Sequence, residues 1–577
     1  MAFDFANFRA GNIASNAELA NSTGLTQATN SISKTNSSTG GSTRVTSSGK
    51  KVGRPKGSTA ANKTSSASSS KRKIGEEDFV PRKSTRTRAA AAVSQEEKQA
   101  IIEKNEKEDL ERRMFERQQK HLEREIFVLT GLQGSQDQES FKEMLRELKD
   151  YKIEKKEEQE EQGEEEGWKL GEKPEFDDGE SLKEMTDNLS LRSIVKVCPE
   201  RIYSLVVHPD VQKDLVFAGD KYGNIALWDA TDAGKTFETT SEEKPTSSIR
   251  GPSVKKEENG GEEEGEEAEE EEEEEVGPSK GKFWLWRAHQ KNSVSCLKFR
   301  PHETKKIYSS CYDSTLRSHD FETGISQEVI DADSDDYDGL LHSFDFDPTG
   351  NEIWATDGGG GLHWRDLRTP IGEAKRWNID RAKVGCISLN PARPTIAATA
   401  HLKREMRIWD LSKIRGLDQD LNHLEIAEQA QLVSYPFEKA CSSSYFDPSG
   451  TRLLSTGYDD TLRVWDIDPY NIEQQVEQDP EFNPTSAFAH NCQVGRFVTV
   501  LRAFWAPQPP SVVTPHIHVG DMRRALDLYL PDGTRVQSYS DEQITAVPAV
   551  TACHPTVPGK YFGGSASGKI AYFAKPI

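Results

Sequence analysis

Apolar and polar positions alternate in seven similar units along the last two thirds of the chain. In each unit an apolar segment ends at a turn that contains proline, and these segments span 203–209, 294–301, 342–348, 385–391, 443–448, 502–507 and 550–555. A later apolar segment ends in each unit at Trp228-Asp229, His319-Asp320, Arg365-Asp366, Trp409-Asp410, Trp465-Asp466, about Leu528-Tyr529 and Tyr572-Phe573. Alternation with a period of two predicts β-strands, and proline ends the first strand because it cannot donate to a sheet ladder.

Each unit predicts one small antiparallel sheet, with a strand of small residues and a tight polar turn between the two apolar segments. A single sheet of this kind cannot bury both of its faces, so several sheets pack radially around a central channel. The units resemble WD40 repeats, with the Trp-Asp pair kept in the first, fourth and fifth. The sequence therefore predicts an all-β fold, a seven-bladed WD40 β-propeller. Because the last unit stops after its third strand, we expect residues 194–197 to complete the last blade.

Two segments precede the propeller, which we place at 185–577. Residues 1–92 are rich in Ser, Thr, Asn, Ala and Gly, which is typical of a disordered tail. Residues 93–184 predict a charged spacer, helical or disordered, with a capping-box pattern at Ser94 and a second helical pattern from Ser140. We interpret both helices as solvated.

An acidic insert at about 232–280 interrupts the first blade. The segment Glu262–Glu275 is nearly all glutamate, so it has almost no apolar residues with which to form a core. We predict a disordered loop outside the blade.

The net charge of −22 conceals a strong asymmetry. Residues 1–92 hold 15 Lys or Arg against 5 Asp or Glu, a net of +10, so the rest of the chain is strongly acidic. A basic arm on an acidic protein indicates contact with a polyanion.

Signals for catalysis, metal binding and membranes are absent from the sequence. The seven cysteines are scattered without a CxxC pair or a Cys/His cluster, which indicates reduced apolar fillers rather than a zinc site or a disulfide framework. No stretch approaches 18 apolar residues, so we expect no membrane partner. We expect a binding protein rather than an enzyme, with no cofactor, no catalytic residue and no metal.

The tail carries a sharper motif at residues 50–57, which resembles an AT-hook. In such a motif Gly-Arg-Pro lies along the narrow minor groove of A·T-rich DNA, where arginine meets an enhanced negative potential. The resemblance implies DNA contacts from Arg54, Pro55 and Lys56, although Val52 stands where the usual motif has a basic residue. Two further basic clusters predict nuclear import, and hence a nuclear protein, with the residues Lys71, Arg72, Lys73, Arg82 and Lys83.

The segment 490–499 precedes the sixth apolar strand. Together with the basic tail and the seven units, it resembles the fungal WD-repeat DNA damage-binding proteins and, more distantly, the small subunit of the UV-damaged-DNA-binding complex. In the distant relative an aromatic-polar-His wedge in this connection enters the duplex, whereas this chain has Gly495-Arg496-Phe497. That difference argues against insertion into the duplex as in the distant relative. The side chains of Arg496 and Phe497 can still stack on bases. The candidate DNA contacts on the propeller are Arg496, Phe497, Arg502, Arg523 and Arg524.

Asp366-Leu367-Arg368 follows the third blade and gives a further candidate contact. In WD-repeat relatives a Trp-Asp-x-Arg ending docks on the adaptor of a cullin-type ubiquitin ligase, and here Arg365 replaces the tryptophan. The predicted docking residues are Asp366 and Arg368.

These observations predict a nuclear protein that binds double-stranded DNA, with a preference for UV-damaged duplex, in DNA metabolism and the DNA damage response. Two alternatives stay open. One is a chromatin scaffold that binds histones, and the other is a substrate receptor of a cullin-type ubiquitin ligase.

Overall fold

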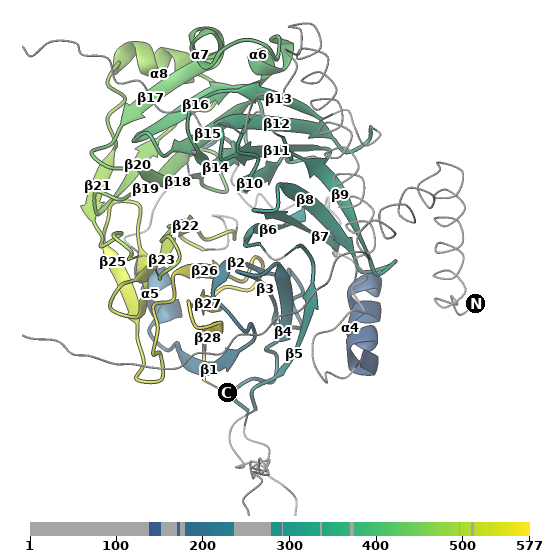
Figure 1. The fold of residues 1–577 in the computed structure, drawn as a ribbon. Coiled ribbons are helices and arrows are strands. Elements are labelled where there is room, and N and C mark those ends of the chain that lie inside the picture. Colours follow the sequence, from purple (N-terminus) through teal and green to yellow (C-terminus); the bar gives the residue numbers. More distant parts are fainter. Residues whose placement is uncertain are drawn as a thin grey trace, which may run out of the picture. The chain divides into compact units, whose positions relative to one another are not determined.

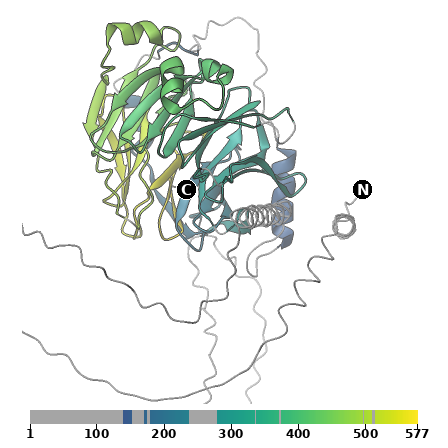
Figure 2. The same ribbon diagram turned by 45° about the horizontal axis from the view of Figure 1, so that its top comes forward.

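A computed structural model describes residues 138–151, 170–173, 179–235, 279–290, 292–334, 337–369, 374–495, 497–508 and 513–576. The described residues form seven four-stranded antiparallel sheets, which surround a common centre (Figure 1; Figure 2). The predicted seven-bladed propeller is confirmed. The predictions for the tail 1–92, the helix expected from Ser94 and most of the acidic insert lie outside the described residues.

Each blade runs outward from an innermost strand that ends near one of the prolines. The innermost strands are β2 (Ile202–Val207), β6 (Val294–Arg300), β10 (Leu341–Phe346), β14 (Val384–Leu389), β18 (Cys441–Phe446), β22 (Phe504–Trp505) and β26 (Val550–Cys553). The second strands are β3 (Leu215–Asp220), β7 (Glu303–Cys311), β11 (Glu352–Asp357), β15 (Ile396–His401), β19 (Arg452–Gly457), β23 (Ile517–Asp521) and β27 (Tyr561–Gly564).

The third strands end at or beside the predicted closures. They are β4 (Asn224–Asp229), β8 (Thr315–Asp320), β12 (Gly361–Asp366), β16 (Glu405–Asp410), β20 (Thr461–Asp466), β24 (Ala525–Tyr529) and β28 (Lys569–Ala574). The outermost strands of the first six blades are β5 (Lys282–Arg287), β9 (Ile325–Asp331), β13 (Lys375–Asn378), β17 (Gln431–Pro436), β21 (Ser486–Ala489) and β25 (Arg535–Tyr539).

A strand from before the first blade completes the last one, as the sequence predicts. Strand β1 (Ser190–Lys196) pairs antiparallel with β28, from Ser190 opposite Ala574 to Lys196 opposite Lys569. The seventh sheet therefore joins the two ends of the propeller sequence through this ladder.

The tryptophans of the repeat pack between sheets with their indole N–H groups satisfied. Trp228, Trp409 and Trp465 are at most 1% exposed. Trp409 donates to the hydroxyl of Thr399 at 2.7 Å, and Trp465 donates to the carbonyl oxygen of Phe482 at 2.8 Å. A buried indole contributes a large apolar area, and its single donor must be paired for that burial to be favourable.

A helix in the predicted spacer packs on the first blade, so its interpretation as solvated is wrong. Helix α4 (Gln138–Asp150) buries Phe141, Met144, Leu145 and Leu148, an apolar stripe at helical spacing. The Phe141 ring lies 5.7 Å from that of Trp286 in β5, centroid to centroid. The charged residues that suggested a solvated helix occupy its other face.

The other helices lie in the connections between strands or before the first strand. Helix α5 (Glu180–Thr186) precedes β1, α6 (Leu411–Gly416) and α7 (His423–Ala430) connect β16 to β17, and α8 (Ile472–Gln478) connects β20 to β21. Within the part of the chain that the structure describes, every helix is too short or too polar to cross a bilayer.

Candidate functional site

One face of the propeller gathers the connections into the innermost strands and the turns between second and third strands. The antiparallel registers place the start of each innermost strand beside the end of the second strand, as at Val294 opposite Cys311 and Cys441 opposite Gly457. We call this the entry face. Its described residues include the turns 221–223, 312–314, 402–404, 458–460 and 522–524, and the connections 379–383, 437–440, 490–495 and 497–503.

Three large apolar side chains stand exposed on the entry face. Tyr222 is 42% exposed, Leu402 is 55% exposed and Phe497 is 76% exposed. Lys221 Nζ lies over the Tyr222 ring, 5.1 Å from its centroid. The exposed parts of the three side chains offer apolar surface to a partner.

The connection that carries Phe497 is fixed to blade 5 and to blade 1. Asp460, in the turn after β19, accepts from the backbone N–H groups of Cys492 at 3.0 Å and Gln493 at 3.2 Å. Farther along, the hydroxyl of Thr499 donates to the carbonyl oxygen of Ile202 in blade 1 at 2.8 Å. Phe497 therefore projects from an anchored connection that reaches from blade 5 to blade 1.

The other predicted DNA contacts differ in their location and in their exposure to solvent. Arg523 and Arg524 are exposed in the turn between β23 and β24, on the entry face. Arg524 holds a φ of 68°, a left-handed conformation that closes the tight turn. Arg502 is half-buried and lines the central cavity. Arg496 and the tail residues Arg54, Pro55 and Lys56 lie outside the described residues, as do the nuclear-import residues.

The centre of the ring encloses a cavity of about 770 Å³, lined by residues of all seven innermost strands. This volume lies within the range of small-ligand sites. Two lysines and one arginine line it. Lys298 pairs with Asp345 at 2.6 Å, whereas Lys383 and Arg502 lie toward the entry face. Sequence reasoning named Arg502 but missed Lys383, because nothing in the local pattern marks a lysine before β14 as facing the channel.

Burial and the neighbouring guanidinium of Arg502 both change the pKa of Lys383. Burial, with a smaller contribution from the guanidinium of Arg502, lowers the pKa of Lys383 to about 8. Arg502 donates to the carbonyl oxygen of Gly385 at 3.3 Å, which uses one of its five N–H groups.

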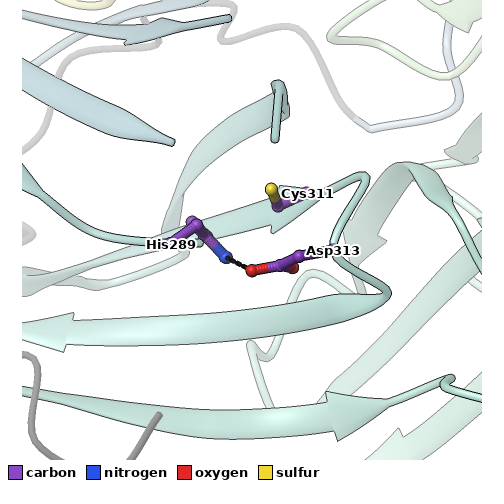
Figure 3. Close-up of side chains that lie close together, drawn as sticks. All are labelled: His289, Cys311 and Asp313. Atoms are coloured by element: carbon purple, nitrogen blue, oxygen red, sulfur yellow. Dashed lines mark hydrogen bonds and ion pairs between the residues drawn. The ribbon is translucent and has the colours of Figure 1, made fainter. Parts of the chain in front are cut away.

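The structure brings together a group of metal-ligand type that the sequence did not indicate. His289, Cys311 and Asp313 lie within ligand distance of one another and are buried (Figure 3). Both ring nitrogens already have partners: Nδ1 lies 3.1 Å from Asp313, and Nε2 lies 2.6 Å from the hydroxyl of Ser309. Cys311 donates to the carbonyl oxygen of Asn292 at 3.4 Å. We interpret the group as a hydrogen-bond network that joins a turn to a blade connection.

The predicted ligase-docking residues pair with each other. Arg368 donates through Nε to Asp366 at 2.9 Å and through a terminal nitrogen at 2.6 Å, and its side chain is 65% exposed. Arg365, which replaces the tryptophan, is buried and donates to the carbonyl oxygens of Val329 and Thr369.

Comparison with known proteins agrees with this architecture. The model of the WD domain, G-beta repeat, matches residues 282–320 and 436–466, which are β5 to β8 and the end of β17 to β20. The chain is 32% identical over 444 residues to the DNA damage-binding protein CMR1 of Cryptococcus neoformans, covering 67% of this chain and 70% of that protein. This chain belongs to the CMR1 family of DNA damage-binding proteins.

Other members of the CMR1 family show similar agreement. The protein of Mycosarcoma maydis is 28% identical over 495 residues, covering 68% of this chain and 73% of that protein. The protein of Neurospora crassa is 32% identical over 380 residues, covering 65% of each. The resemblance to fungal WD-repeat proteins of this kind is therefore confirmed.

Proposed function

We propose that this chain is a nuclear protein that binds double-stranded DNA through its entry face and prefers damaged duplex. The exposed ring of Phe497 on an anchored connection carries the proposal. The names of the CMR1 relatives, which describe DNA damage-binding proteins, support it.

The chemistry of the entry face suits this task. A damaged base step is already partly unstacked, so a side chain that enters it meets a smaller deformation cost. Phe497 offers a stacking face, and the exposed Arg523 and Arg524, in one turn of the same face, can contact phosphates. The basic tail would add sequence-independent phosphate contacts.

The test compares the full chain with the double variant Arg496→Ala, Phe497→Ala on matched UV-irradiated and intact duplexes at two salt concentrations. We expect affinity for damaged duplex to fall about tenfold and affinity for intact duplex to fall less. Leu424→Ala is the control, because Leu424 is 65% exposed on α7, in the connection between β16 and β17 and not in the one that carries Phe497.

An unchanged ratio of damaged to intact affinity would show that this connection only covers the channel. A wild-type chain that retains core histones and ignores both duplexes would replace the proposal with the histone-binding scaffold.

A second candidate function is that of a substrate receptor in a cullin-type ubiquitin ligase. The exposure of the Arg368 guanidinium and its fixed position on Asp366 favour it. Arg368→Ala should then abolish capture of the ligase adaptor and leave DNA binding unchanged. Capture by the variant at wild-type strength would rule out docking at this site.

A further inference from the structure

Two cations at the entry end of the channel have no carboxylate within ion-pair distance among the described residues. They are Lys383, in the connection before β14, and Arg502, just before β22. Asp338 is the carboxylate whose charge acts on Lys383, but it is exposed and no ion pair joins the two. The third cation of the channel, Lys298, is neutralised by Asp345. The positive charge of the lining is therefore concentrated at Lys383 and Arg502.

Two hydrogen-bond donors lie near one of these cations, Arg502. The phenols of Tyr312 and Tyr458 line the same part of the cavity, near Arg502. Burial raises the pKa of both Tyr312 and Tyr458 above the ordinary value, so each keeps its proton at neutral pH and can donate. Two cations and neutral hydroxyls together are suited to a polyoxygen anion.

We propose that Lys383 and Arg502 form a subsite for a terminal phosphate, the phosphomonoester at the end of a nucleic-acid strand. The inference rests on the proposed DNA binding and goes beyond it by naming a strand end as the group that enters the channel. A phosphomonoester carries a charge of about −1.5 to −2 at neutral pH, which matches two cations better than the single charge of a backbone phosphodiester. Arginine adds a planar fork that fits phosphate oxygens.

The location of the pair selects a strand end over the middle of a duplex. Lys383 and Arg502 are both half-buried and line the channel, which the seven innermost strands enclose. A duplex that lies across the entry face presents its backbone to the exposed residues around the channel. A strand end carries no further nucleotide beyond its phosphate, so it can enter the recess.

The experiment measures binding of the full chain to one single-stranded oligonucleotide in two forms, with a 5′-phosphate and with a 5′-hydroxyl. We expect the phosphate to raise affinity about tenfold, the effect of one or two charge-assisted hydrogen bonds. Lys383→Met and Arg502→Met should remove this advantage, and Lys383→Arg should retain it. Lys439→Met is the matched control, because Lys439 is exposed on the entry face in another connection.

Thermal melting of each variant, with Arg502→Lys as the milder replacement, separates loss of the subsite from loss of the fold. Inorganic phosphate is added as a competitor to distinguish a free anion from a strand end.

Equal affinity for the two oligonucleotides would overturn the inference, even if inorganic phosphate binds, and would leave the proposed DNA binding intact. Tighter binding of the phosphorylated strand by wild-type and Lys383→Met proteins alike would also overturn it. If damaged and intact duplexes bind no more tightly than a non-nucleic polyanion while the 5′-phosphate effect persists, the proposed function fails and the subsite stands.

Discussion

The hydroxyl of Thr499 donates to the carbonyl oxygen of Ile202, so the connection before blade 6 is fixed to the first residue of blade 1. The two residues are separated by most of the propeller sequence, and both are buried. This hydrogen bond holds the segment that carries Phe497 across the entrance to the channel. The position of the exposed ring is thus determined by a contact between distant blades.

Replacing Thr499 by valine should therefore disturb recognition more than folding. The variant keeps the shape of the side chain and leaves the carbonyl oxygen of Ile202 without its partner, which costs about 1–3 kcal/mol. We expect a lower melting temperature and a smaller ratio of damaged to intact duplex affinity, because the Phe497 ring is less well positioned. Thermal melting measures the melting temperature, and fluorescence anisotropy on the same preparation measures the affinity ratio. A melting shift with an unchanged affinity ratio would mean that this anchor contributes stability alone.

The basic motif in the tail makes a separate prediction. Changing Arg54 to alanine should weaken binding to A·T-rich duplex, because arginine is the side chain that reads a narrow minor groove. The melting temperature of the propeller should stay constant. Parallel titrations on A·T-rich and G·C-rich duplexes measure the effect, with Arg44→Ala as a control of equal charge elsewhere in the tail. Equal loss on both duplexes would identify the motif as diffuse charge.

The sequence predicted the blades because each one repeats the same local signals. Proline after the innermost strand and Trp-Asp at the end of the third made the repeats visible, even where His319 or Arg365 replaces tryptophan. The closing strand could be located because the last repeat has only three of the four strands that a blade needs.

The channel and the packing of helix α4 on the first blade could not be predicted in the same way. Lys383 and Arg502 come from different blades, so their proximity depends on the ring and not on any local spacing. The His289–Asp313 contact likewise joins a blade connection to a turn. In α4 the high charge concealed an apolar stripe at Phe141, Met144, Leu145 and Leu148 whose partner lies far along the chain.

The packing of α4 predicts the limits of the protease-resistant core. Because Phe141 is buried against Trp284 and Trp286, the resistant fragment should begin near residue 138 rather than near 185. Phe141→Ala removes most of this contact, with a loss of up to about 3–5 kcal/mol for the docked helix, and should move the first cut to near residue 180. Mass spectrometry of limited digests identifies the termini. A stable fragment that ends near residue 400 would contradict a single propeller.

The two cations of the channel predict how binding of a phosphorylated strand depends on pH. The pKa of Lys383 is about 8, lowered first by burial and then by Arg502, so its charge is lost as the pH rises through that value. Binding of an anion favours the charged form. Affinity for the 5′-phosphorylated oligonucleotide should therefore be highest near pH 7 and fall by up to about tenfold per pH unit above about pH 8.

The other groups around Lys383 do not titrate in this window. Burial lowers the pKa of His342 to about 2 and raises the pKa of Tyr312 and of Tyr458, so all three stay neutral. Arg502 keeps its charge, and the exposed Asp338 is the acidic neighbour. Lys383→Arg should flatten the profile, because arginine stays charged throughout, while Lys439→Met should leave the wild-type slope. Affinity measured at half-unit intervals from about pH 7 to about pH 9.5 distinguishes the three proteins. If Lys383→Arg showed the wild-type slope, the titrating group would have to lie elsewhere, and Lys383 would not contact the phosphate.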